Sequence, residues 1–289
     1  MINPLSDNVF KDWLQFLLTT EDRSAVSASL NLCDYYYLDE QTKRTLPEEL
    51  SLKLLVHGSL FRKMEDAKFN QMDDYHWTRI GKAFVNLYPH RSLELAEKIV
   101  EHFGEDGTIV EGFHSSTQAV LNEIARLKPK EIWTLTTKYL GPPIDSRAFR
   151  ICLWLRGGEF FAEGEGALTG FPREDIWSWV DHDVEKRAWY VAHFAPKTTS
   201  LDKWKGSLAR EILVRYGHRK DVRNELRANY STESWWGPES AHHEGKKQIL
   251  LQFKNEETNK NVKQWLDEYV SILDEEIKRA KIEEERTGF

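Results

Sequence analysis

The chain has few of the residues that mark secreted, membrane-spanning or metal-binding proteins. Its 289 residues include two cysteines, Cys33 and Cys152, which both lie in apolar helical patterns and form no metal-ligand motif. A reduced, cytoplasmic setting is the simplest expectation. No apolar run approaches the length that spans a bilayer, and the first ten residues lack the basic and apolar regions of a signal peptide. We therefore expect no membrane partner.

Sequence motifs of catalysis are also missing. No glycine-rich loop carries the lysine that cradles a phosphate, and no Ser-His-Asp or Cys-His arrangement can be assembled from spacing. Glu276-Ile277-Lys278 has the letters of a nuclease motif but falls in a charged terminal helix, so we treat it as chance. The sequence therefore predicts a protein without catalytic residues and without a cofactor.

What the chain does have is the composition of a folded helical protein. Apolar residues make up 40% and charged residues 30%, which favours packed amphipathic helices over disorder. Eleven tryptophans are many for this length, and we expect most of them to pack between helices. The net charge of −7 argues against a dedicated DNA-binding protein, because such proteins are usually basic.

A spacing near 40 residues recurs along the chain. Val222 and Val262 open two helical segments 40 residues apart, and Val184 precedes Val222 by 38. The same interval of 40 separates further pairs: Pro89 and Pro129, Leu87 and Leu127, Leu95 and Leu135, Lys98 and Lys138, Arg147 and Arg187. A period near 40 in helix-forming sequence is typical of stacked helical hairpins. We therefore predict internal repeats from about residue 73 onward.

The local patterns predict helices and no strands. Expected helices include 73–88, one ending near Gly104, one ending at Leu127, 146–155, 204–216, 221–229, 239–255 and 260–286. An earlier helix is expected to end at His57, before Gly58. The last helix begins with an apolar stripe and ends in mostly charged sequence, which suits a terminal cap on a repeat array. The fold class is therefore all-α.

The hairpin length, the Val-Arg or Val-Lys opening of the second helix, and turns such as HRKDVR and NKNVK resemble HEAT repeats. The resemblance implies one right-handed α-solenoid over residues 1–289, with about six to seven antiparallel helical hairpins. Residues 1–70 would be irregular N-terminal helices and residues 73–289 HEAT-like repeats, interrupted by an insertion at 157–171. The C-terminal segment is also similar to the repeat tails of large bacterial proteins, some of them suspected defence proteins.

HEAT-like proteins mostly act as scaffolds, so the resemblance implies a non-catalytic scaffold or regulatory module that binds a partner protein within a bacterial multi-component, defence-type system. The alternative is a nucleic-acid-binding HEAT-like protein or a DNA-repair glycosylase. That alternative would use a basic face within residues 197–227, whose local charge is +5. Its candidate phosphate-binding residues are Lys203, Lys205, Arg210, Arg219, Lys220, Arg223 and Arg227. A solvated helix face is the commoner explanation, and the acidic stretch 157–185 is one possible intramolecular partner.

Two aromatic pairs are candidate partner-binding residues. Phe160 and Phe161 lie in the insertion 157–171, which has no helical period. Trp235 and Trp236 precede Gly237-Pro238 and are suited to stacking on a partner or on a base. The more common outcomes are phenylalanines that pack back onto the stack and tryptophans that fill the gap between two hairpins. Glu239 and His243 have the i, i+4 spacing of metal ligands but lack a third group, so we predict no metal site.

Overall fold

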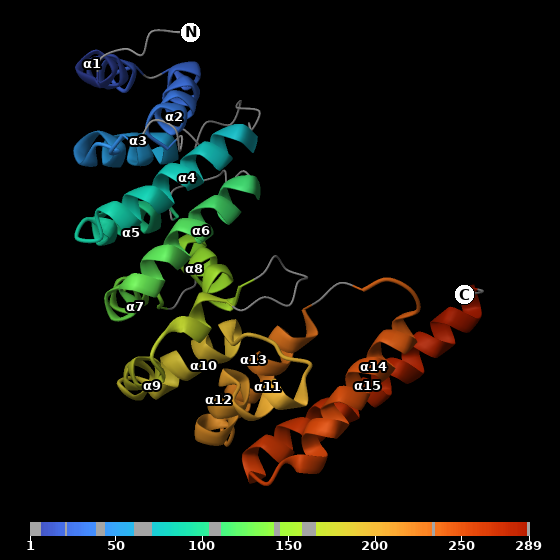
Figure 1. The fold of residues 1–289 in the computed structure, drawn as a ribbon. Helices are drawn as coiled ribbons and strands as arrows, with labels where there is room; N and C mark the ends of the chain where they lie inside the picture. Colours follow the sequence, from blue (N-terminus) through green and yellow to red (C-terminus); the bar gives the residue numbers. More distant parts are fainter. Residues whose placement is uncertain are drawn as a thin grey trace. The chain divides into compact units, whose positions relative to one another are not determined.

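The computed structural model describes residues 7–20, 22–38, 44–60, 71–103, 111–141, 145–157, 166–232 and 235–287. Within these ranges the regular structure is helical and no strand occurs, which confirms the all-α prediction (Figure 1). The contacts divide the chain into two compact units, Met1–Ile151 and Cys152–Phe289. The boundary falls inside α8 (Ser146–Arg156). A single domain over residues 1–289 stays a prediction.

Unit 1 contains two rows of helices. Its elements are α1 (Asp7–Leu17), α2 (Arg23–Leu38), α3 (Glu48–Leu60), α4 (Gln71–Leu87), α5 (Ser92–His102), α6 (Glu111–Leu127) and α7 (Pro129–Thr137). In the first row α2 packs on α4 and α4 on α6, while in the second row α3 packs on α5 and α5 on α7 (Figure 1). Neighbours in the first row run parallel: Ser27 donates to Asp73 near the start of α2 and α4, and Asp34 accepts from Arg79 further along both.

The close approach of helices in unit 1 depends on glycine. A Cβ added at Gly81 of α4 would lie 2.7 Å from Cγ2 of Val120 on α6, so the two helices meet where no side chain intervenes. In α3 the helix continues through Gly58 to Leu60, and the expected end at His57 is wrong. The side chain of Trp77 lies against Gly58, where an added Cβ would be 3.2 Å from its ring. Glycine weakens a helix, but at position 58 it leaves room for the Trp77 ring, and α3 continues through it.

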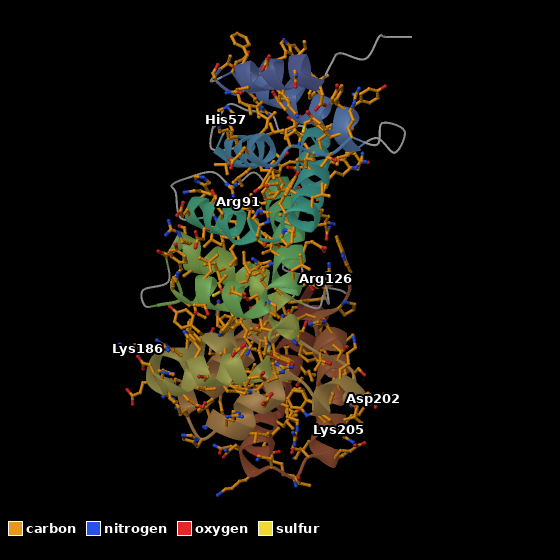
Figure 2. All side chains as sticks on the ribbon, turned by 60° about the vertical axis from the view of Figure 1, so that its left-hand side comes forward. His57, Arg91, Arg126, Lys186, Asp202 and Lys205 are labelled. Atoms are coloured by element: carbon orange, nitrogen blue, oxygen red, sulfur yellow. The ribbon has the colours of Figure 1, made fainter. Side chains whose placement is uncertain are left out.

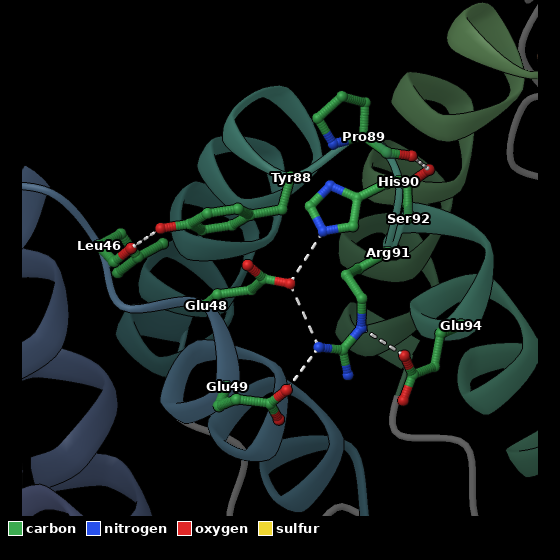
Figure 3. A network of polar contacts seen from close by, with 9 residues as sticks. All are labelled: Leu46, Glu48, Glu49, Tyr88, Pro89, His90, Arg91, Ser92 and Glu94. Carbon is green, nitrogen blue, oxygen red and sulfur yellow. Dashed lines mark hydrogen bonds and ion pairs between the residues drawn. The ribbon is translucent and has the colours of Figure 1, made fainter.

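A network of charged side chains joins the start of α3 to the turn before α5 (Figure 3). Arg91, at the N-cap of α5, bonds Glu48 at 3.3 Å, Glu49 at 2.7 Å and Glu94 at 2.6 Å. Hydrogen bonds from the guanidinium lower the pKa of Glu94. His90 reaches Glu48 at 3.0 Å from the same turn. Carboxylates here also suit the positive ends of both helices, so the network ties two neighbours of the second row.

Unit 2 follows with shorter helices and one long pair. Its elements are η2 (a 3-10 turn, Ala167–Gly170), α9 (Arg173–Asp181), α10 (Val184–Phe194), α11 (Leu201–Lys205), α12 (Leu208–Tyr216), α13 (Lys220–Ser231), α14 (Glu239–Glu256) and α15 (Lys260–Thr287). Asp183 caps α10, since its side chain accepts from the backbone N–H of Lys186. Ion pairs Lys281–Glu244 and Lys254–Asp267 show that α14 and α15 run antiparallel.

The expected helix 204–216 is two helices in the structure. The chain breaks at Gly206, which ends α11, and Ser207 then caps α12 by accepting from the backbone N–H of Arg210. The break lets Trp204 lie fully inside the core, where it stacks on Phe253 at 4.7 Å between ring centroids. Such a stack contributes about 0.5–1.5 kcal/mol beyond the area it buries. Packing therefore overrides the apparent continuity of the helical pattern.

The 40-residue interval reappears in side-chain contacts. In unit 1 the Arg147 guanidinium lies 4.7 Å from the ring centroid of Tyr139, and in unit 2 Arg187 lies 5.0 Å from the ring of Trp179. Each arginine also donates to a backbone carbonyl near the end of a helix, Arg147 to Glu101 and Arg187 to Trp179. Both the arginines and the aromatic residues are 40 apart. The arginine–aromatic contact thus occurs twice at the same interval, whereas the carbonyl partners of the two arginines lie 46 and 8 residues away in the chain.

Candidate partner-binding surface

The most exposed tryptophan of the chain is Trp236. Six of the eleven tryptophans are buried, as expected for packing units, but the Trp236 side chain is fully exposed at 101%. Trp235 beside it is 38% exposed. The interpretation that these two residues fill a gap between hairpins is therefore wrong for Trp236. Tryptophan is the residue type most enriched among the side chains that dominate binding at protein interfaces, so we take Trp236 as the candidate contact residue.

The backbone around Trp236 is held in a defined turn. Gly237 has φ of 97°, a left-handed conformation that glycine adopts without strain. Pro238 follows as the N-cap of α14, and its fixed φ starts the helix. We call residues 235–238 the tryptophan turn. Gly237 and Pro238 thus define the backbone conformation that follows Trp236.

Trp235 anchors this turn to α14. Its ring stacks on His242 with centroids 4.6 Å apart and planes 10° apart, and its centroid lies 5.9 Å from that of His243. One face of Trp235 is therefore covered by the first two turns of the helix. The two tryptophans have different roles: Trp235 holds the turn in place and Trp236 presents its ring to solvent.

Carboxylates surround the base of the turn. His243 is 9% exposed and lies between two of them, with Nε2 3.4 Å from Glu239 and Nδ1 3.8 Å from Glu276. Glu284 of α15 accepts from both the backbone N–H and the hydroxyl of Ser240, and these hydrogen bonds lower the pKa of its carboxyl. Across the described residues no group of three or more potential ligands is arranged to hold a metal. We assign no metal to Glu239 and His243.

The lysines of α14 and α15 near this surface have other partners. Lys246 donates to the backbone carbonyl of Tyr230 at 3.2 Å, Lys247 pairs with Asp274 at 2.5 Å, and Lys281 pairs with Glu244 at 2.7 Å. The contacts of Glu239 and Glu276 described above are with an imidazole. The surface around the tryptophan turn thus combines an exposed indole with negative charge.

The predicted basic face 197–227 makes extensive intramolecular contacts. Arg210 forms two hydrogen bonds with Glu257, at 2.7 and 3.0 Å, and Arg223, whose side chain is 8% exposed, reaches Glu268 at 3.0 Å. Lys205, labelled in Figure 2, pairs with Glu256 at 2.6 Å. The carboxylates that pair with these three residues come from 256–268. The acidic stretch 157–185 is therefore not their partner.

The other candidate phosphate-binding residues divide into two groups. Arg219 bonds Asp221 at 2.8 Å and the backbone carbonyl of Glu185 at 3.1 Å, and Arg227 donates to Asn224 at 3.2 Å. Lys203 and Lys220 are exposed. A phosphate would have to compete with the existing acceptors of the arginines, so this surface is not a set of cations presented to solvent.

A hollow between α9 and α12 is lined by charged side chains and by the ring of Trp177. Trp177 donates from its indole to Glu211 at 2.5 Å, and the Arg215 guanidinium lies 4.8 Å from the ring of Trp177. Glu211 also lies 3.7 Å from Arg215 and 3.9 Å from Arg173. Because Trp177, Glu211 and Arg215 contact one another, we interpret the hollow as a polar seam that joins the two helices.

Unit 1 contains a buried acid–histidine pair that the sequence did not point to. Asp34 is 2% exposed, accepts from Nδ1 of His76 at 2.6 Å and pairs with Arg79 at 3.1 Å. The other ring nitrogen of His76 lies 3.1 Å from the Asn31 amide nitrogen. Both ring nitrogens are therefore engaged with α2, and the arrangement is a lock between α2 and α4. The 42-residue separation of Asp34 and His76 hides it from local patterns.

The remaining candidates give no reactive group. Phe160 and Phe161 lie outside the described residues. At the end of their insertion the 3-10 turn η2 forms where a loop was expected, and the buried Phe171 packs on Trp154 with ring centroids 6.1 Å apart.

Both cysteines are buried, and burial raises the pKa of Cys33 and raises that of Cys152 to about 12. Neither thiol has the low pKa of a nucleophile.

Comparison with protein-family models, with curated proteins and with solved structures found no match to this chain. None of the helices that the structure describes combines the length and apolar character that crossing a bilayer requires. The functional argument therefore rests on the surface itself.

Proposed function

We propose that this protein is a non-catalytic HEAT-like scaffold that binds a partner protein through the tryptophan turn. The observation that carries the proposal is the complete exposure of Trp236 on a turn fixed by Gly237 and Pro238. Tryptophan is among the residues that most often dominate binding energy at protein interfaces. A turn that is already ordered reduces the entropy that association costs.

The proposed architecture is a right-handed α-solenoid of stacked helical hairpins. The two rows of helices in unit 1 support it, because neighbours in one row run parallel, as equivalent helices of successive repeats do. The recurrence of the arginine–aromatic contact after 40 residues supports an internal repeat. Such stacks are extended binding surfaces, which suits a scaffold that belongs to a multi-component system.

The nucleic-acid alternative has less support. Four of its seven candidate residues, Lys205, Arg210, Arg219 and Arg223, form ion pairs with carboxylates of this chain. If one of these side chains bound a phosphate instead, it would gain one charged contact and lose the one with its carboxylate. The tryptophan turn is also a poor base-stacking site, because carboxylates surround it.

The decisive test compares two exposed tryptophans. We expect Trp236→Ala to reduce co-purification of the native partner from the source cells by roughly 30-fold, corresponding to a hot spot of about 2 kcal/mol. Trp13→Ala is the matched control, since Trp13 is 46% exposed on α1. Quantitative mass spectrometry of the captured proteins measures both. Equal recovery of the same partners with wild-type protein and Trp236→Ala would contradict the proposal, provided that circular dichroism shows both variants folded.

A further inference from the structure

The chemistry around the tryptophan turn indicates what kind of segment it binds. Trp236 offers an uncovered indole, and Glu239 and Glu276, which both contact His243 on α14, have side chains 53% and 38% exposed. Glu284 adds a third negative charge at the start of α14, where Ser240 holds it. An aromatic face beside carboxylates attracts a cation by two independent effects, the ring quadrupole and direct charge pairing.

The carboxylates are held in position for such a role. The Glu239 side chain contacts His243 within the first two turns of α14, and Glu276 contacts the same ring from α15. His243 itself is 9% exposed and lies beside the Trp235 ring, which is stacked on His242. The Trp235 indole, His243 and both carboxylates thus form one cluster, next to Trp236 in the chain, and need little ordering on binding.

Three lysines of α14 and α15 have partners other than Glu239 and Glu276. Lys247 and Lys281 form ion pairs with Asp274 and Glu244, and Lys246 donates to a backbone carbonyl. We propose that the partner segment that docks on the tryptophan turn is basic: a lysine or arginine side chain packs on the Trp236 indole and pairs with Glu239 and Glu276. This inference rests on the proposed function. Phosphate-rich ligands, whether nucleic acid or anionic lipid, are disfavoured by the same carboxylates.

The test uses the full chain and three fluorescein-labelled nonapeptides that differ only in charge: one with alternating arginine and glycine, one with glutamate in place of arginine, and one with serine. Fluorescence anisotropy measures their affinities. We expect the basic peptide alone to bind, with an affinity at least about fivefold lower for Trp236→Ala. The double variant Glu239→Gln/Glu276→Gln should lose about three- to tenfold, and this loss should shrink as salt is added.

A matched control removes the effect of net charge. Glu97→Gln/Glu131→Gln makes the same charge change at exposed positions on α5 and α7 of unit 1. We expect its affinity for the basic peptide to equal that of the wild type. An equal loss in both double variants would show that the peptide senses only the overall charge of −7 and would overturn the inference.

The outcomes separate this inference from the proposed function. If Trp236→Ala loses the native partner but the basic peptide fails to bind up to about 1 mM, the scaffold proposal stands and the basic-segment inference is wrong. If Trp236→Ala keeps the native partner, both fail. Trp236-dependent binding of an oligonucleotide or of phosphatidylserine vesicles, in place of the basic peptide, would also overturn the inference.

Discussion

Gly237 and Gly245 are eight residues apart and have different backbone conformations. Gly237 has φ of 97° in the tryptophan turn, whereas Gly245 lies inside α14 with nothing within 4 Å of an added Cβ. A side chain at the first position strains the turn, while at the second it only lowers the entropy of the unfolded chain. The value of a glycine thus depends on its conformation.

The same substitution at both glycines should therefore have opposite effects. We expect Gly237→Ala to lower the free energy of unfolding by about 1 kcal/mol and to weaken partner capture. Gly245→Ala should raise the free energy of unfolding by about 0.5–1 kcal/mol without altering capture. Urea titration followed by circular dichroism measures both. A destabilising effect at Gly245 or a neutral one at Gly237 would show that the turn is not held as described.

At the scale of elements, carboxylates fasten α12 and α13 to the C-terminal helices. Burial would raise the pKa of Glu257, but hydrogen bonds from Arg210 and from the backbone N–H groups of Asn259 and Thr258 lower it below its usual value. Glu268 behaves in the same way, since hydrogen bonds from Arg223 and Gln264 outweigh the effect of burial on its pKa. Both carboxylates are therefore stabilised in their charged form in the folded protein.

This arrangement predicts a specific loss of stability in acid. A carboxyl whose pKa is lowered on folding stabilises the protein fully above its unfolded pKa, about 4.3 for glutamate. That contribution disappears as the pH falls through the lower folded value. We expect the urea midpoint to fall as the pH drops below about 4.3, and the pH dependence to be smaller in Glu257→Gln. Glu131→Gln, an exposed control in unit 1, should keep the wild-type dependence, and a Glu257→Gln curve of unchanged slope would contradict the assignment.

At the scale of the whole molecule, charge separates the two classes of partner. The chain carries a net charge of −7, and three cations of its basic stretch, Lys205, Arg210 and Arg223, pair with carboxylates outside that stretch, Glu256, Glu257 and Glu268. Affinity for DNA derives largely from cations that neutralise phosphates and release counterions. Most of the excess positive charge of residues 197–227 is thus paired with carboxylates of the same chain.

We therefore expect no micromolar binding of duplex or single-stranded DNA at about 150 mM salt in a mobility-shift titration. Reversing the two exposed lysines, Lys203→Glu/Lys220→Glu, should change nothing that can be measured. If the wild type bound DNA at micromolar concentration in a salt-dependent way and this double variant did not, the nucleic-acid alternative would be favoured over the protein-binding proposal.

The sequence was most informative about local structure. The helical periods predicted the all-α class and most helix boundaries, including the long final helix. These features depend on neighbours within a few residues, where backbone hydrogen bonds and side-chain spacing are decisive. The repeat of 40 was visible as residue types that recur at a fixed interval, and Arg147 and Arg187 each lie over an aromatic ring at that interval.

Tertiary structure decided which side chains remain exposed. By spacing alone, Trp235 and Trp236 were equivalent, and only folding stacks one on His242 and leaves the other uncovered. The basic stretch was equally ambiguous, because the carboxylates of Glu257 and Glu268 lie more than 40 residues from Arg210 and Arg223. Exposure and pairing depend on contacts between distant segments. The amino-acid sequence by itself therefore determined the helices, their repeat and the candidate tryptophan pair, and packing decided that Trp236 is the member left uncovered.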